Sequence, residues 1–446
     1  MAGLAAAAFS LEEGAFALIP APLGMRAVSV AAINPGGQQS LDEARDAVAA
    51  ALKLRKARDA YIDILDQIEE LRAAFRPLGE IADRLAEEFA RNCADNDGAD
   101  RFVAPHYERL KEAGLIHAGV PAELGGAGAS VRQLADMLRR LAHGCCSTAL
   151  ALSMHTHQVA FPAWRWQRQP DARPTVEPLL RRIAGERIVL LSSGGGDWIG
   201  GSGKAEKVDG GYKVTARKMF VSGAPAGAVL ITSAVVDEDG PKVIHFPVPM
   251  NAAEVSILDT WHTLGMRATG SHDVMIDGLF VPDEKIAAKR PAGEWHPLFY
   301  GMANLVFPLI YAVYVGVAER ARDLAVGIAT KRPVSARQVL RAGEMDTALT
   351  AARLAHEHML AVCERNAPGP DSINAIMTGR RLVEENAIRT VEKALELAGG
   401  PGFYRKAELE RLFRDVQACR YHPLQKEAQT EFAGAMALGQ PTETIY

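Results

Sequence analysis

Residues 204–223 read KAEKVDGGYKVTARKMFVSG, and they carry the clearest structural signal in the chain. The segment contains two runs in which apolar and polar residues alternate, and Asp209, Gly210 and Gly211 separate them. Alternation with a period of two is typical of a half-buried strand, and a short Gly-rich break between two such runs predicts a β-hairpin. We therefore expect two antiparallel strands joined at this break.

The strand-like pattern continues beyond this hairpin, and no helical pattern interrupts it as far as residue 282. The segments are AVLITSAVV at 228–236, KVIHFPVPM at 242–250, VSILDTW at 255–261 and HDVMIDGLFVP at 272–282. Short strands at regular spacing without intervening helices predict a β-sandwich or barrel rather than a parallel sheet. We assign this middle β domain to residues 191–285.

Helical patterns flank the β domain on both sides. Before it, amphipathic or apolar segments divided by Gly and Pro predict an N-terminal all-α domain at 75–190. After it, long helical segments with short breaks predict a C-terminal four-helix bundle at 286–446.

Residues 1–74 form an N-terminal extension outside this layout. The first forty or so residues are rich in Ala, Gly and Pro without a sustained period, so we expect them to be loosely ordered. From Ser40 to about Phe75, apolar residues recur near helical spacing, which predicts a helix. Packing of that helix on the body is the simpler interpretation, and a coil that binds a partner is the alternative.

The bulk composition excludes several classes of partner. The chain has 446 residues, of which 50 are basic and 54 acidic, so its formal charge of −4 favours neither nucleic acid nor an anionic membrane. No apolar run approaches the roughly 18–20 residues of a membrane span. Five scattered cysteines without a C-x-x-C pair predict reduced thiols in the cytoplasm, with no disulfide framework and no metal site.

Four motifs follow one another along this layout. They are RLKEAGLIHAGVPAELGGAG at 109–128, AEKVDGGYKVTARKMFVSGA at 205–224, TLGMRATGSHDVMIDGLFVPDE at 263–284 and ELAGGPGFYRKAELERLFRDVQA at 396–418. Together they resemble the acyl-CoA dehydrogenase superfamily over residues 75–446. The resemblance implies the helical–β–helical fold of that superfamily, an oxidoreductase with a flavin between the β domain and the helices, and a homodimer or homotetramer.

The resemblance also implies which residues bind the flavin, either FAD or FMN. The end of the second motif, an Arg after the first bundle helix and the Gly-rich loop of the fourth motif supply the contacts. Glycines suit this role because backbone amides approach an anionic pyrophosphate only where no side chain intervenes. The matching positions here are Phe220, Val221, Ser222, Arg332, Gly399, Gly400 and Gly402.

The carboxylate that acyl-CoA dehydrogenases use is missing from its expected positions. In that family a Glu removes a proton from the acyl group while a hydride passes to the flavin, and such a base must reach the proton directly. The matching position after Arg414 and Asp415 is Pro423, and a second known location falls near Val306. Neither side chain accepts a proton, so the resemblance to dehydrogenases does not extend to the base.

Three other side chains are candidates for catalysis. His422, beside the vacant position, and Ser222 resemble residues of flavin monooxygenases that share this fold and receive reduced flavin from a separate reductase. An imidazole near physiological pKa exchanges protons, and a hydroxyl hydrogen-bonds the flavin or the oxygen that it activates. His155 and His157 lie about 200° apart on a predicted helix, so at most one faces the cleft. The resemblance to sulfur-oxidising members favours His157, although a core histidine is an equal alternative.

Three functions remain open from the sequence. The first is a monooxygenase that acts on a small organic substrate with reduced flavin. The second is an acyl-CoA dehydrogenase whose base comes from elsewhere, such as Glu427 or Glu431. The third is a scaffold subunit that keeps the fold without catalysis. Trp198 and Trp261 are candidates for the mouth of a substrate pocket.

Overall fold

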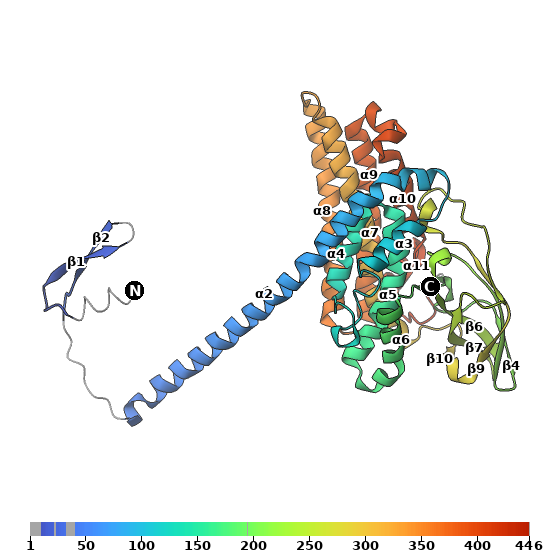
Figure 1. Ribbon diagram of the computed structural model, residues 1–446, viewed down its shortest axis with the longest axis horizontal. Helices are drawn as coiled ribbons and strands as arrows, with labels where there is room; N and C mark the ends of the chain where they lie inside the picture. Colours follow the sequence, from blue (N-terminus) through green and yellow to red (C-terminus); the bar gives the residue numbers. More distant parts are fainter. Residues whose placement is uncertain (1–9, 22–23, 33–40, 194, 446) are drawn as a thin grey trace. The chain divides into compact units, whose positions relative to one another are not determined.

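The computed structural model describes residues 10–21, 24–32, 41–193 and 195–445. For residues 19–21, 24–27, 41–48, 63–77 and 197 it describes the backbone alone. The chain divides into two units, Met1–Ala74 and Phe75–Tyr446, and each is considered by itself (Figure 1).

The first unit contains a hairpin that the sequence did not predict. Strands β1 (Phe16–Ala21) and β2 (Gly24–Ser29) pair antiparallel, and β1 includes Pro20, a residue that counts against a strand in a pattern analysis. Helix α2 (Leu41–Gly98) begins where the helical spacing begins and continues into the second unit. The loose order expected of residues 1–9, 22–23 and 33–40 lies outside the described residues.

The second unit has the predicted order of helices, β domain and helices, so the expected fold class is confirmed. The helices of its first part are α3 (Ala104–Glu112), α4 (Val131–Gly144), α5 (Cys146–Arg168) and α6 (Arg173–Glu186). Helix α5 is buried along most of its length because its residues are apolar or small on nearly every face. It packs against strand β3 of the sheet and against α7 of the bundle, which places it between the two other parts.

The β domain is one eight-stranded sheet. Its strands are β3 (Leu190–Ser192), β4 (Lys204–Val208), β5 (Gly211–Lys218), β6 (Val229–Asp237), β7 (Pro241–Pro249), β8 (Val255–Ile257), β9 (Val274–Pro282) and β10 (Ala288–Pro291). The order across the sheet is β10-β7-β6-β4-β5-β9-β8, with β3 paired to β6. Strands β4 and β5 form the predicted hairpin, in which Val208 faces Gly211.

The last part consists of α7 (Pro297–Ala329), α8 (Ala336–Arg365), α9 (Pro370–Ala398), α10 (Leu409–Val416) and α11 (Lys426–Leu438). Helix α8 starts at a capping box, in which the Ser335 amide donates to Gln338 Oε1 at 3.0 Å. Although no membrane-length apolar run was expected, an 18-residue window of α7 has mean hydropathy 1.7 and would suit a membrane span. The protein itself buries 94% of that window, which is typical of the core helix of a soluble protein.

The buried carboxylate of Glu319, on α7, connects this helix to α4 and α8. The side chain of Glu319 accepts from Arg139 of α4 at 2.7 Å and from Arg353 of α8 at 2.8 Å, and His143 lies 2.9 Å away. Although burial opposes the charge, these partners hold the pKa of Glu319 at about 2. We expect Glu319→Ala to lower the free energy of unfolding by about 2 kcal/mol, because Arg139 keeps Asp136 as a partner and Arg353 still reaches water. Urea unfolding at neutral pH measures this loss, and an unchanged midpoint would show that the cluster contributes nothing.

Candidate active site

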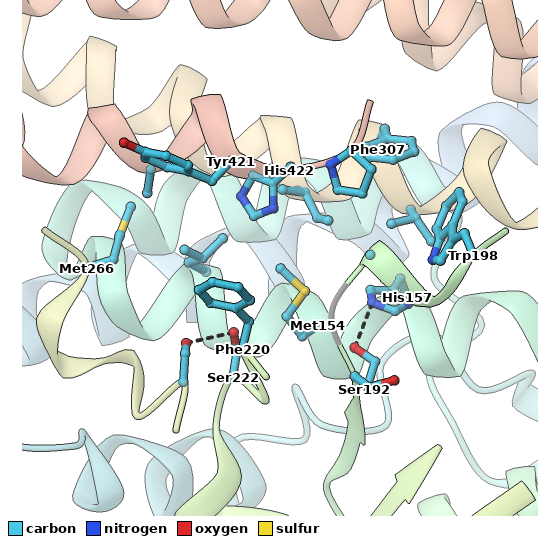
Figure 2. A pocket seen from close by; sticks show the side chains of 18 of the residues that line it. Met154, His157, Ser192, Trp198, Phe220, Ser222, Met266, Phe307, Tyr421 and His422 are labelled. Atoms are coloured by element: carbon cyan, nitrogen blue, oxygen red, sulfur yellow. Dashed lines mark hydrogen bonds between the residues drawn. The ribbon is translucent and has the colours of Figure 1, made fainter. Parts of the chain in front are cut away.

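A pocket of about 470 Å³ lies between the sheet, helices α5 and α7, and the short helix Gln417–Tyr421 (Figure 2). His422 and Tyr421 lie on one wall, and Phe220, Ser222 and Met154 lie on the facing wall. His157, Ser192 and Trp198 lie at one end. The pocket therefore brings together Phe220, Ser222, His157 and His422, which are far apart in the sequence.

The end of β5 presents Phe220 and Ser222 to the pocket. Phe220 has a φ of 56°, a conformation that is costly for a bulky residue, and its ring is 58% exposed with its edge toward Trp261. Ser222 Oγ lies 2.8 Å from Ser271 Oγ, which lies 2.7 Å from Thr269 Oγ1, so a chain of hydroxyl groups fixes its position. Val221 is fully buried, does not line the pocket and donates its amide to the His272 carbonyl at 3.1 Å, so its contact with flavin stays a prediction.

His422 lines the pocket opposite this strand end. Its Nε2 lies 2.7 Å from the hydroxyl of Tyr314, and the tautomer decides which atom donates. Burial among packed side chains, with a smaller contribution from Arg380, lowers the pKa of His422 to about 3. The expectation of an imidazole that titrates near physiological pH is therefore wrong, because the ring is neutral there. A neutral ring still has one nitrogen on Tyr314 and the other available to a ligand.

A buried arginine beneath the pocket holds the backbone that carries His422. Arg380 of α9 is fully buried, and its Nη2 donates to the carbonyl oxygens of Cys419 at 3.0 Å and His422 at 2.9 Å. Glu384, one turn later, lies 3.0 Å from the same Nη2, and Tyr311 donates to the Cys419 carbonyl at 2.7 Å. Sequence reasoning missed Arg380 because an Arg and a Glu four residues apart are typical of an exposed helical ion pair. Only the tertiary contacts reveal its role.

The two histidines of α5 have different environments. His157 lines the pocket, its Nε2 is 3.4 Å from Ser192 Oγ, and burial lowers its pKa to about 3. His155 lies away from the pocket, where its Nε2 is 2.7 Å from the carbonyl of Ile116 and its Nδ1 accepts the amide of Leu190 at 2.9 Å. His155 therefore connects α5 to β3 and has no ring nitrogen left for a ligand.

Acid should destabilise the protein through His155. Burial lowers the pKa of His155 to about 4 in the folded chain. The unfolded chain therefore binds a proton near pH 6.5, whereas the folded chain binds it only near pH 4. The stability from this group is complete above pH 6.5 and is lost as the pH falls toward 4. When the pH is lowered from about 7.5 to about 5, we expect the unfolding free energy of the natural chain to fall by about 2 kcal/mol more than that of His155→Gln. Urea unfolding at both pH values measures this, and equal losses would contradict it.

The pocket has apolar side chains at both positions where the family's base was expected. None of the described residues that line it is an Asp or a Glu, and both Val306 and Pro423 are among them. Glu427 and Glu431, proposed above as substitute bases, are exposed on α11 and do not line the pocket. The buried carboxylate of Asp415 also lies outside the lining, and it accepts the Met266 amide at 2.5 Å. Burial raises the pKa of Asp415 to about 7, and this side chain anchors the 263–267 loop.

Two sequence models match this chain. One describes the N-terminal domain of acyl-CoA dehydrogenases and matches residues 73–168, and the other describes their C-terminal domain and matches residues 309–427. The L-evernosamine nitrososynthase of a Micromonospora strain is 30% identical over 412 residues, which cover 84% of this chain and 94% of the relative. The chain belongs to the acyl-CoA dehydrogenase superfamily. It is thus a flavoprotein oxidoreductase, as the sequence predicted.

Two further relatives differ in the ligand or the activity that their names give. A solved structure of KijD3 in complex with FMN and an amino-keto dTDP-sugar has a TM-score of 0.76 and 27% identity, and covers 82% of this chain and 94% of KijD3. YdbM of Bacillus subtilis, whose name places it among the acyl-CoA dehydrogenases, is 28% identical over 361 residues, which cover 77% of this chain and 92% of YdbM.

The pocket fits the ring system of the flavin that this superfamily uses. Its walls are mainly apolar and aromatic, and Ser222 supplies a hydroxyl at the strand end. Phosphate needs cations or free amides, and the charged side chain in the lining, Arg414, already pairs with Asp97 at 2.6 Å and Glu410 at 2.9 Å. The pocket therefore suits the ring and not the phosphate.

The remaining predicted contacts lie outside this pocket. Arg332 follows α7 and is exposed, and Gly399 and Gly400 follow α9 with open space where a Cβ would stand. Gly402 is buried, and a Cβ there would lie 2.7 Å from that of Ala398. None of these four residues is in the lining, so their contact with flavin stays a prediction.

Proposed function

We propose that the protein is a monooxygenase that takes reduced flavin from a separate flavin reductase and oxygenates a small organic substrate. The balance is substrate, dioxygen and reduced flavin giving oxygenated substrate, water and oxidised flavin. The lack of any Asp or Glu among the described lining residues carries the proposal, because desaturation of an acyl-CoA needs a carboxylate at the reacting carbon.

Bound reduced flavin supplies the two electrons that reduce dioxygen. This chain contributes, on each side of the site for the flavin ring, an uncharged side chain that can donate or accept a hydrogen bond. His422, with Tyr314 behind it, holds or passes a proton at the ring nitrogen that faces the pocket. Ser222 offers a hydroxyl from the opposite wall, and its bond to Ser271 orients it. His157 is a third neutral group, at the end near Trp198.

The surroundings of these groups favour oxygen transfer over the wasteful release of hydrogen peroxide. Val306, Phe307 and Ile310 of α7 are buried and line the pocket, so they exclude water from the reacting atoms. In such a site a hydrogen bond from a fixed neutral donor is stronger than it is in water.

Further parts of the proposal concern assembly and location. Because Arg332 and Gly399–Gly402 do not line this pocket, we propose that they reach the flavin of a neighbouring subunit in a homodimer or homotetramer. All five cysteines are unpaired, which supports a reducing cytoplasm.

The second candidate is an acyl-CoA dehydrogenase, which the likeness to YdbM and the shared motifs favour. It requires a carboxylate base, which none of the described lining residues supplies. A scaffold without catalysis would bind no flavin, a result that a simple binding titration would give.

Reduced flavin delivered by a reductase under isotopically labelled oxygen tests the proposal. We expect oxygen consumption to depend on this protein and on the substrate, with one labelled atom in the product. Consumption that yields only hydrogen peroxide with every substrate would contradict the proposal.

A further inference from the structure

We infer that the substrate is an uncharged aromatic compound, and that an apolar wall formed by α5 and α7 selects it. This helix wall consists of Leu150, Met154, Met302, Val306, Phe307 and Ile310. The inference rests on the proposed function and names its substrate class.

The helix wall has no charged or hydrogen-bonding side chain. Leu150 and Met154 lie one turn apart on α5, ahead of the polar His157 and Gln158, and Met302, Val306 and Ile310 lie at successive turns of α7, so both helices present apolar side chains to the pocket. The two methionines are flexible, and their sulfur atoms make favourable contacts with aromatic rings. A flat apolar ligand gains contact area along both helices.

One end of the helix wall is aromatic. Trp198 stacks on Phe299 with ring centroids 5.3 Å apart and an interplanar angle of 20°, and it tilts against Phe307 at 5.6 Å. All three rings line the pocket. This aromatic corner favours an aromatic ligand, because a ligand ring can pack edge-to-face or offset-stacked against these side chains.

The described lining offers no unpaired carboxylate or guanidinium to a charged ligand. A protonated amine needs a carboxylate, and none of the described lining residues has one. A carboxylate needs a cation that is not already paired, and Arg414 is held by Asp97 and Glu410. Burial also keeps His157 and His422 neutral at physiological pH, and the third lining histidine, His245, accepts from Arg290 Nε at 3.1 Å through an Nε2 that carries no proton. A charged group would therefore lose its water without gaining an oppositely charged partner, at a cost in binding free energy.

A neutral polar atom is accommodated beside this wall. The amide of Gln158 lines the pocket, next to His157, and can donate to or accept from a phenol, an indole nitrogen or an ether oxygen. The site thus admits an uncharged ring with one or two polar atoms.

Three matched probes test the inference on the protein saturated with oxidised FMN. They are 2-naphthol, 2-naphthoate and 2-naphthylmethylamine, which at neutral pH are neutral, anionic and cationic on the same ring. By isothermal titration calorimetry we expect 2-naphthol to bind at least about 10-fold more tightly than either charged probe. Equal or tighter binding of a charged probe, or no binding of 2-naphthol, would overturn the inference.

A charged substitution in the helix wall provides a second test of the inference. Met302 is half-buried, so Met302→Glu should fold, and Met302→Gln is its neutral match in size. We expect Met302→Glu to bind 2-naphthylmethylamine about 10-fold more tightly than Met302→Gln does. No difference between the two variants would show that this wall does not set charge selectivity.

These measurements need no oxygen transfer, so they separate the inference from the proposed function. Failure of labelled oxygen to enter a product, with the binding order intact, removes the function alone. Oxygenation together with a charged preference removes the substrate class alone.

Discussion

His422→Ala is expected to reduce oxygen-dependent product formation by about 10²–10⁴-fold, the range usual for loss of a group that transfers protons. The substitution removes the imidazole from the pocket wall and leaves the Tyr314 hydroxyl without its partner at 2.7 Å. The measurement is product formed per reduced flavin consumed, because a site without this donor still lets reduced flavin react with oxygen. We expect flavin consumption to continue and hydrogen peroxide to replace the product.

Two further variants separate catalysis from folding. Tyr314→Phe keeps the imidazole and removes its partner, so we expect a smaller loss than for His422→Ala. His358→Ala changes an exposed histidine of α8 and should leave product formation unchanged. Full coupling in His422→Ala, with normal flavin binding, would remove the assignment of His422 to the reaction.

Arg380→Met is expected to lower the free energy of unfolding by about 3 kcal/mol, because two buried carbonyl oxygens and one carboxylate lose a charged donor. The change removes one of the two cations beside the buried Glu384 carboxylate, which keeps Arg381 at 2.5 Å. It also removes the donor to the carbonyl oxygens of Cys419 and His422. Urea unfolding measures the loss, and product formation in the folded variant reports on the position of His422.

The controls for Arg380 lie on the same helix. Arg389→Met removes an exposed arginine of α9 and should change stability by no more than about 0.5 kcal/mol. The double variant Arg380→Met with Glu384→Leu removes both charges and should recover part of the stability, because an apolar pair avoids desolvation. A loss below about 1 kcal/mol in Arg380→Met would show that the buried pair does not hold the segment.

The sequence predicted the order of parts and the β4–β5 hairpin because both depend on local periodicity. The break at Asp209–Gly211 and the alternation on either side need no distant partner to be recognised. The hairpin of β1 and β2 was missed for the same reason, since Pro20 interrupts the local pattern that would have indicated a strand.

Other properties of the site depend on tertiary packing and could not be predicted. The i, i+4 spacing of Arg380 and Glu384 is the same for a solvated pair and a buried one. The pKa of His422 falls to about 3 because folding buries the ring, and no feature of the RYHPLQ motif indicates that burial. The sequence places the Gly399–Gly402 motif after the third long helix of the bundle. It does not indicate whether this loop contacts the flavin of its own subunit or of a neighbouring one.

Anaerobic titration of the FMN- or FAD-loaded protein with acyl-CoAs of short, medium and branched chains tests the central claim most directly. The claim is that the described lining residues offer imidazole and hydroxyl groups and no carboxylate to take a proton from carbon. The account predicts that the oxidised flavin keeps its visible absorbance with every acyl-CoA. Bleaching of the flavin, with an enoyl-CoA formed in equal amount, would contradict it.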